Sequence, residues 1–351
     1  MYRNKTASRI TSICATFSVL VLLYLIFLLC IITYFNAPNS YHREDKRFVI
    51  EKGMTLRQVV EKLHEDEIIK SPSAFLLISQ MIKGLDPKVR YGEYFLEKNI
   101  SYYKILKKIN RGFVFFHKIT VPEGFSVDSA LKTIEAAPGL SGKVAEKIAE
   151  GTLLPETYFY SYNDSKQAMI RRMQEAMTKA VNQLWEGRDP AIPLRTKQEA
   201  IVLASIVERE TNLDSERAKV ASVFTNRLRK GMKLQSDPTI IYSFTKGDKS
   251  LEHPIRVSDI QNNSPFNTYH IYGLPPTPIC NPGLASIKAV LNPPKTDYLF
   301  FVASGNGGHI FSANIKDHNA YVAQYRKVLK EKGEINNNVE SSPAVAPDVT
   351  R

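Results

Sequence analysis

The sequence predicts an α+β protein in three parts: an N-terminal transmembrane helix, a small module of βααβ type, and a mixed α/β domain. Three observations predict this organisation. A long uncharged apolar stretch lies near the N-terminus, one strand-turn-helix pattern occurs three times, and the stretch Thr196–Asn212 carries an apolar run that ends in a carboxylate. A chain of 351 residues has room for two or three domains.

The first predicted element is a membrane-spanning helix over residues 10–35. No Asp, Glu, Lys or Arg occurs from Ile10 to Tyr41. The segment Ile13–Phe35 is rich in Leu, Ile, Val and Phe, and it is long enough to cross a hydrocarbon layer of about 30 Å. A cleavable signal peptide is the alternative, but its apolar region would be shorter and would end in a small-residue cleavage site. We therefore expect a retained anchor.

The charges around this helix predict its orientation. Arg3, Lys5 and Arg9 precede the apolar stretch. By the positive-inside rule, residues 1–9 stay in the cytoplasm and the rest of the chain lies on the outer side. The net charge of +12 could suggest nucleic-acid binding. This topology and the lack of a recognition motif argue against that interpretation. Anionic lipid or an acidic cell-wall polymer is the better expectation.

The cysteines exclude a disulfide framework. Cys14 and Cys30 fall in the predicted span, which leaves Cys280 as the only cysteine outside it. A cysteine-based zinc site is excluded for the same reason.

One strand-turn-helix pattern occurs three times, at Val49–Thr55, Phe95–Ser101 and Val121–Ser126. Each copy has a turn residue that tolerates positive φ, followed two positions later by a residue that can cap a helix. The turn residues are Gly53, Asn99 and Gly124, and the caps are Thr55, Ser101 and Ser126. Apolar residues recur at matching offsets after each cap, which predicts one buried stripe per helix.

Residues 47–113, with two of these units, resemble the small wall-binding LysM module. Glycan binding is what this resemblance implies, although many α+β domains contain the same turn. Phe113–Thr120 reads as a further strand that leads into the third unit, so we place the boundary of the second domain at residue 114.

Residues 114–332 are expected to form the second domain. We expect helical stretches within 143–183, interrupted by the loop Gly151–Tyr158, and a linker over 188–195. A helix over Asp214–Lys230 would be capped by Asp214 and end at Gly231. The remaining predictions are loops over Leu234–Gly283, a hairpin of Tyr298–Ala303 with His309–Ser312, a helix over about 317–332, and a disordered tail over 333–351.

The stretch TKQEAIVLASIVERETN predicts a buried helix with Glu208 near its end. Thr196 and Glu199 form a capping box, and the apolar residues go nearly all the way round. Ser205, Ala204 and Ile201 share the face of Glu208, which suits the floor of a groove.

Two interpretations of Glu208 stay open. A carboxyl near apolar surface has a raised pKa and can hold a proton for use as a general acid. Alternatively, Glu208 is a structural carboxylate paired with Arg217 or Arg227.

Other catalytic chemistries lack their motifs. No G-x-S-x-G elbow, no H-E-x-x-H pair and no G-x-x-x-x-G-K-[ST] loop occurs, and we expect no metal or cofactor. Ordinary glycosidases use two carboxylates, but only Glu208 stands out here, since Glu210 points elsewhere on the same helix. A single acid suffices when a hydroxyl of the substrate itself attacks the anomeric carbon.

Seven blocks, in order, resemble the YceG-like family of endolytic murein transglycosylases. They are Glu123-Gly124, Gly151–Tyr158, Ala204–Thr211, Phe224–Leu228, Leu234–Thr239, Asn267–Tyr269 and Gly273–Pro276. The chain departs mildly at Thr277, where relatives often have Gly.

The resemblance implies an inner-membrane enzyme that faces the periplasm and cuts the MurNAc-GlcNAc β-1,4 bond of nascent peptidoglycan strands. The products would carry 1,6-anhydro-MurNAc ends, strand elongation would stop, and peptidoglycan synthases would be nearby. The catalytic acid falls on Glu208, and the residues that would line the cleft are Gln235, Asp237, Asn267 and Tyr269.

Each of these loop residues also has an architectural interpretation. Asp237 before Pro238 is a turn former, and Asn267 can cap. The alternative function is a non-catalytic, membrane-anchored protein that binds peptidoglycan or acts as a scaffold.

Overall fold

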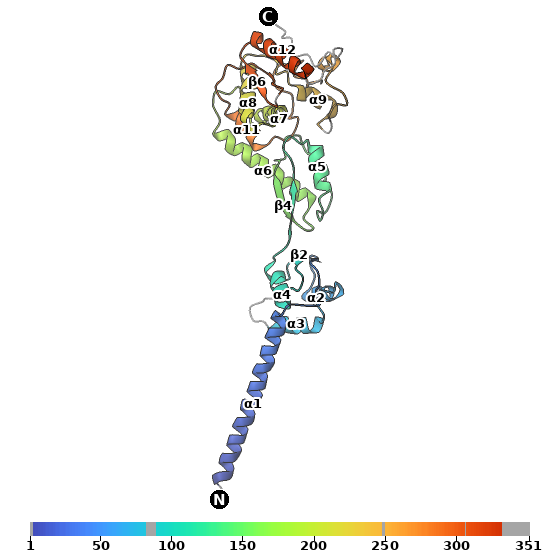
Figure 1. Cartoon of the computed structure of the whole chain (residues 1–351), viewed down its shortest axis with the longest axis vertical. Helices are drawn as coiled ribbons and strands as arrows, with labels where there is room; N and C mark the ends of the chain where they lie inside the picture. The colour runs from blue at the N-terminus through green and yellow to red at the C-terminus, as the bar shows by residue number, and fades with distance from the viewer. Residues whose placement is uncertain (1–2, 82–88, 248–249, 306, 332–351) are drawn as a thin grey trace. The chain divides into compact units, whose positions relative to one another are not determined.

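The computed structural model describes residues 3–81, 89–247, 250–305 and 307–331 (Figure 1). The predicted tail over 333–351 lies outside the described residues. The chain divides into two compact units: unit 1 comprises residues 1–117 and 160–163, and unit 2 comprises 118–159 and 164–351.

Unit 1 has the order α1 (Arg3–Asn36), β1 (Lys46–Ile50), α2 (Leu56–Glu65), α3 (Pro72–Met81), β2 (Gly92–Leu96) and α4 (Tyr102–Arg111). The two strands pair antiparallel, with Phe48 opposite Tyr94. Both rings are fully buried. The predicted βααβ order is therefore present, and α4 completes the core with the apolar residues Ile105, Leu106 and Ile109.

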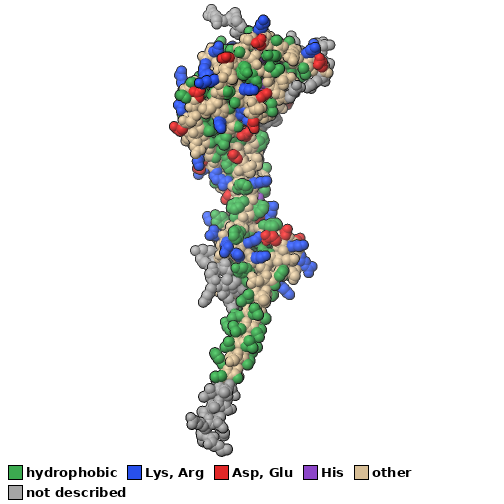
Figure 2. Space-filling model, turned by 60° about the vertical axis from the view of Figure 1, so that its left-hand side comes forward, with side chains coloured by type: hydrophobic (Ala, Val, Ile, Leu, Met, Phe, Trp, Pro, Cys, Tyr) green, Lys and Arg blue, Asp and Glu red, His purple; other side chains and the backbone are tan. Residues whose placement is uncertain are grey.

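Helix α1 contains a segment long and apolar enough to span a membrane, Cys14–Asn36. Most of its side chains are exposed, with Phe35 the buried exception, and Figure 2 shows a column of hydrophobic groups along the helix. Such a surface is stable only against another apolar phase. The length and composition of this segment are therefore compatible with the predicted membrane anchor over residues 10–35.

The three strand-turn-helix predictions are confirmed. Gly53, Asn99 and Gly124 have φ values of 92°, 59° and 78°. The hydroxyl of the residue two positions later accepts a backbone N–H of the next helix in each case, from Thr55 for α2, Ser101 for α4 and Ser126 for α5 (Val127–Glu135). Local turn chemistry alone was enough to position these helices.

Unit 2 is mostly helical. Between α5 and the hairpin come β4 (Thr157–Ser161), α6 (Lys166–Glu186), α7 (Lys197–Glu210), α8 (Asp214–Arg229), α9 (Asp237–Thr245), α10 (Val257–Ile260) and α11 (Leu284–Leu291). β4 pairs with β3 (Phe116–Thr120), and the division between the units falls within these two strands. The predicted hairpin is confirmed as β5 (Phe300–Ala303) and β6 (His309–Ser312), and α12 (Ile315–Glu331) follows.

Helix α7 packs against α6, α8, α9 and α11 in the core of unit 2 (Figure 1). Leu203, Ala204, Ile206 and Val207 of α7 have no exposed surface. The prediction of a helix buried on all sides is confirmed, and this position determines where its last turn emerges.

Three local predictions were wrong. Asp214 is the first residue of α8 rather than its cap; Leu213 occupies the cap without a side-chain hydrogen bond, and Asp214 pairs with Arg217. The loop predicted over 234–283 contains α9 and α10, because Pro238 in the first turn is compatible with a helix start. Residues 143–150 form no helix, and a glycine with positive φ lies on each side of them.

The left-handed turn at Asn99 gives a stability prediction. Asn99 donates its backbone N–H to the His42 carbonyl at 2.8 Å, and its carbonyl accepts the Asn39 N–H at 3.1 Å. These bonds hold the backbone of Asn99 in its conformation. Asn99→Val places a β-branched residue at positive φ and should lower the free energy of unfolding by about 1 to 3 kcal/mol. Asn99→Gly is the control and should cost far less. Urea unfolding of the detergent-solubilised chain tests this, and equal losses for both variants would contradict it.

Candidate active site

The last turn of α7 carries Glu208 to the edge of the unit 2 core. The helix starts with a complete capping box, in which the Thr196 hydroxyl accepts the Glu199 N–H at 3.1 Å and the Glu199 carboxylate accepts the Thr196 N–H at 3.2 Å. Glu208 is only 6% exposed. A carboxyl so placed needs a defined partner, because burial of an unpaired charge is costly.

The direct partner of Glu208 is a backbone amide. Gly283 donates its N–H to Glu208 Oε2 at 2.9 Å. Arg217 Nη2 lies 3.9 Å from Glu208 Oε1, at the outer limit of an ion pair, while the same guanidinium contacts Asp214 closely. Arg227, the other predicted partner, bonds instead to backbone carbonyls and to Gln235. Glu208 is therefore held by one backbone hydrogen bond and by one long ion pair with Arg217.

A second carboxylate, Glu123, lies beside Glu208 and was not predicted as a site residue. Its side chain rests on Gly283, where a Cβ would lie 1.7 Å from Glu123 Oε1. The next residue, Gly124, brings the backbone over Glu208, since a Cβ there would lie 3.7 Å from Glu208 Cγ. Burial raises the pKa of Glu123, and the negative charge of Glu208 raises it further. The two acids thus converge on one glycine.

Asn281 joins the segments that build this arrangement. Gly124 donates its N–H to the Asn281 carbonyl at 3.0 Å. The backbone N–H of Asn281 donates in turn to the Phe125 carbonyl at 2.8 Å. The Asn281 side-chain oxygen accepts the Leu153 N–H at 3.0 Å. One buried asparagine therefore holds the turn of Glu123, the loop at Gly151–Tyr158 and the segment that carries Gly283.

The predicted groove floor is not present along Ser205 and Ala204. Both residues are completely buried. Ile279 donates its backbone N–H to Ser205 Oγ at 3.0 Å, and the Cys280 thiol contacts the Ser205 carbonyl. The small side chains let the proline-rich segment pack closely against α7 and cover Ser205.

Gln235, Asp237 and Tyr269 come together in a second polar cluster. The Tyr269 hydroxyl donates to Asp237 Oδ1 at 2.5 Å, and Arg227 donates to Gln235 Oε1 at 3.1 Å. Glu210 also belongs to the cluster, through the Ser236 hydroxyl, which donates to its carboxylate at 2.5 Å. The prediction that Glu210 points away from Glu208 is confirmed.

Burial dominates the electrostatics of this second cluster. It raises the pKa of Glu210 to about 8, against the opposing effect of the Ser236 hydrogen bond. It also raises the pKa of Asp237, and it lowers that of Arg227 to about 10. Shifts of this kind gather at functional sites, but buried structural networks produce them as well.

Asn267 contacts this cluster through the backbone of Tyr269. It is fully buried, and its amide nitrogen donates to the carbonyls of Ile260 at 2.8 Å and Asn262 at 2.7 Å. Its side-chain oxygen accepts the Tyr269 N–H at 3.0 Å. These bonds build the loop, and they correspond to the architectural interpretation of Asn267.

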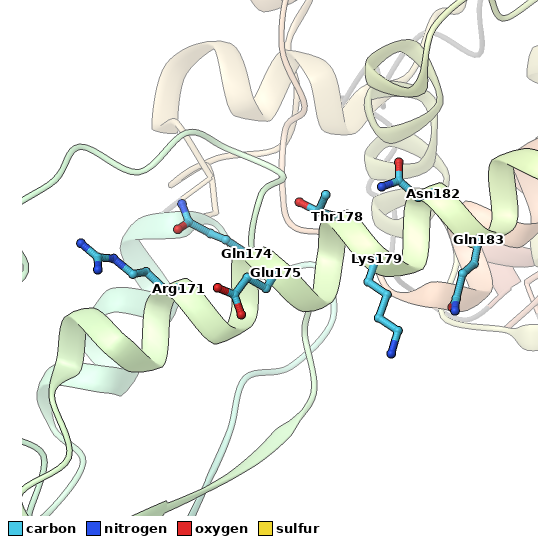
Figure 3. A pocket seen from close by; sticks show the side chains of 7 residues that line it. All are labelled: Arg171, Gln174, Glu175, Thr178, Lys179, Asn182 and Gln183. Atoms are coloured by element: carbon cyan, nitrogen blue, oxygen red, sulfur yellow. The ribbon is translucent and has the colours of Figure 1, made fainter.

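A separate hollow of about 540 Å³ lies along α6 (Figure 3). Its lining consists of polar and charged side chains from that one helix, which project outward without converging on a point. The junction of Glu208, Glu123 and Gly283 is therefore the better candidate for an active site.

Known proteins resemble this chain over most of its length. The model of the YceG-like family matches residues 48–324. A relative from Bacillus subtilis named endolytic murein transglycosylase is 30% identical over 318 residues, which cover 81% of this chain and 85% of the relative. A Streptococcus pneumoniae protein of the same name is 27% identical over 79% of this chain, which spans only 57% of that longer relative. The solved structure of a yceG-like protein from Listeria monocytogenes superposes with a TM-score of 0.50 at 26% identity, over 79% of this chain and 98% of that one.

The buried acid Glu210 predicts a pH dependence of stability. Its folded-state pKa of about 8 exceeds the ordinary value of 4.5. The folded chain therefore holds a proton that the unfolded chain releases, so the free energy of unfolding falls as pH rises through this window. Glu210→Gln removes the titration but keeps an oxygen for Ser236, and its unfolding temperature should fall less between about pH 5 and pH 8.

Glu175→Gln, on the exposed face of α6, is the matched control for this measurement. It should keep the pH dependence of the parent chain. Calorimetry at both pH values tests the prediction, and parallel curves for the parent and Glu210→Gln would contradict it.

Proposed function

The chain belongs to the YceG-like family, and from this premise we propose that it is a lytic transglycosylase that cuts peptidoglycan strands internally with Glu208 as its acid. The observation that carries the proposal is the single hydrogen bond from Gly283 to Glu208 at the end of a buried helix. It orients one carboxylate oxygen and leaves the other available.

The proposed reaction is an internal displacement. Glu208 donates its proton to the glycosidic oxygen of a MurNAc-GlcNAc bond while the bond from that oxygen to the anomeric carbon breaks. The 6-hydroxyl of the same MurNAc then attacks that carbon, and the Glu208 carboxylate takes up the hydroxyl proton. The proton returns to the enzyme, no water is consumed, and one product carries a 1,6-anhydro end.

Two neighbours support the acid in this cycle. When Glu208 is ionised, the Gly283 N–H and the Arg217 guanidinium, 3.9 Å away, stabilise the negative charge. Glu123 is exposed to solvent and its carboxylate rests against Gly283. Its carboxylate is placed to stabilise the positive charge that develops at the anomeric carbon in an oxocarbenium-like transition state.

The polar cluster of Gln235, Asp237 and Tyr269 is our candidate for sugar recognition. These side chains are half-buried and held by hydrogen bonds, so they offer fixed donors and acceptors at low entropic cost. Asn267 contributes by shaping the loop that carries Tyr269.

The proposed location is the inner membrane, with α1 as a single-pass anchor, the N-terminus cytoplasmic and unit 2 in the periplasm. There the enzyme would meet nascent strands beside their synthases and end elongation by cutting them. The βααβ part of unit 1 is the candidate LysM-like module, which would hold the glycan.

The rival proposal is a binding protein in which Glu208 forms a structural ion pair. The long Arg217 distance and the bond to a backbone amide favour the acid instead. A buried acid kept for structure alone would be expected to close its ion pair.

The first test is Glu208→Gln, which keeps an oxygen for Gly283 but carries no transferable proton. We expect release of anhydro-muropeptides from purified sacculi to fall by at least about 100-fold, because general acid catalysis contributes about 10² to 10⁴ in rate. Sedimentation of the variant with sacculi should be unchanged. Release of anhydro-muropeptides that persists in this variant would show that Glu208 is not the acid. The mass of the products distinguishes a transglycosylase from a hydrolase, because hydrolysis adds a water.

The second test is Gly283→Ala. The new methyl group would occupy the place of the Glu123 carboxylate and force the two acids apart. We expect a loss of activity of about 10-fold or more, since small displacements at an active site are costly. Gly187→Ala is the control, because a Cβ there meets only one carbonyl at 4.0 Å. Equal activity of the two variants would argue against a role for the Glu123 position.

A further inference from the structure

The end of α1 is built rigidly into unit 1. Phe35 is 2% exposed and packs against Phe75, Tyr102 and Tyr103, with ring centroids 6.0, 6.1 and 6.4 Å away. Tyr34 meets Tyr102 edge to face at 5.8 Å. The module therefore begins where the apolar helix ends, without a flexible linker.

This packing places the first turn of α4 at the level of the lipid headgroups. The candidate span Cys14–Asn36 has 23 residues, about 35 Å of helix, against a hydrocarbon core of about 30 Å. Residues 34 to 36 thus lie at or just beyond the edge of the core. The headgroup layer adds about 5 to 7 Å on each side. This thickness is comparable to the distance between the Tyr34 and Tyr102 ring centroids, 5.8 Å.

A lysine-rich hollow lies beside this point. Its volume is about 500 Å³, and its lining includes Lys98, Lys104, Lys107, Lys108 and Phe113. Glu97 neutralises Lys108 with a contact of 2.8 Å. Among the described residues, no carboxylate pairs with the other three lysines.

Two contacts link this hollow to the end of α1. Lys107 Nζ lies 5.8 Å from the Tyr103 ring centroid, and that ring packs on Phe35. The backbone of Asn99, in the hollow's wall, is hydrogen-bonded to Asn39 and His42, just after α1. Phe113, which lines the hollow, is 57% exposed.

A second hollow, of about 310 Å³, lies directly at the end of α1. Its lining combines Tyr34, Tyr41 and Tyr102 with Lys70. Tyrosine is enriched at membrane interfaces because its ring is apolar and its hydroxyl is polar, and lysine extends to reach the phosphates. Both hollows therefore have the composition of a headgroup-facing surface.

We propose that unit 1 rests on the membrane that α1 crosses, with Lys98, Lys104, Lys107 and Lys70 bound to the phosphates of anionic phospholipids. The inference rests on the proposed anchor and adds a second, electrostatic contact beside it. Such contacts strengthen with each basic residue near the surface and weaken with salt. They hold the module at one height and orientation instead of letting it pivot on α1.

An acidic wall polymer is the competing occupant. A bilayer is favoured because the aromatic packing places the lysines beside the end of the span whether or not a polymer is present. Phe113 at the rim also suits an interface with acyl chains rather than a hydrated polyanion.

The test is hydrogen exchange of the full chain in nanodiscs of phosphatidylglycerol with phosphatidylcholine, compared with phosphatidylcholine alone. We expect slower exchange of residues 96–114 in the anionic discs, reversed by about 0.5 M salt. In the triple variant Lys98→Gln, Lys104→Gln, Lys107→Gln, the phosphatidylglycerol fraction needed for half-maximal protection should rise about 3-fold or more.

The matched control removes the same charge from exposed positions of α12, with Lys316→Gln, Lys327→Gln, Lys330→Gln. It should keep the protection of the parent chain. Three outcomes would each overturn the proposal. Exchange could be equal in the two lipids, protection could survive in the Lys98, Lys104 and Lys107 variant, or protection could appear in neutral discs only after an anionic wall polymer is added. Failure of the anchor would show separately, as a chain that does not assemble into neutral discs, and failure of the catalytic proposal would leave these exchange rates unchanged.

Discussion

The site depends on how closely the segment before α11 packs against α7. Three hydrogen bonds hold this segment: Ile279 and Cys280 donate to Ser205, and Gly283 donates to Glu208 one helical turn later. Only small side chains on α7 permit this approach, which explains the Ala204 and Ser205 pair beneath the acid. The segment that covers the helix is therefore also the segment that orients its carboxylate.

This packing brings like charges together, one on the buried Glu208 and one on the exposed Glu123. Glu123 and Glu208 meet at Gly283, and Arg217 is the one cation that lies within ion-pair range of Glu208 in the part of the chain that the structure describes. Burial raises the pKa of Glu123, and repulsion from the Glu208 carboxylate raises it further, which favours a proton on Glu123. The arrangement is costly to maintain, so the rigid Asn281 contacts around it have a clear physical purpose.

Sequence patterns predicted what local chemistry determines. The turns at Gly53, Asn99 and Gly124 could be placed because positive φ and a following cap involve only neighbouring residues. The burial of α7 followed from apolar residues on nearly every side of the predicted helix. Asp237 was harder, since an Asp-Pro pair suits both a turn and a helix start, and only the packing of α9 decides between them.

The second acid could not be predicted, because it reaches the site through distant backbone contacts. Glu123 lies about 160 residues before Gly283, and the hydrogen bonds of Asn281 that bring the two together involve main-chain atoms that no side-chain pattern encodes. The Glu123-Gly124 block did carry a signal: a glycine with positive φ directly after an acid indicates a backbone that must pass close to something. That neighbour is Glu208, whose Cγ would lie 3.7 Å from a Cβ at Gly124. A turn glycine beside an acid is thus evidence for a site only when the partner element is known, and here the partner is the last turn of α7.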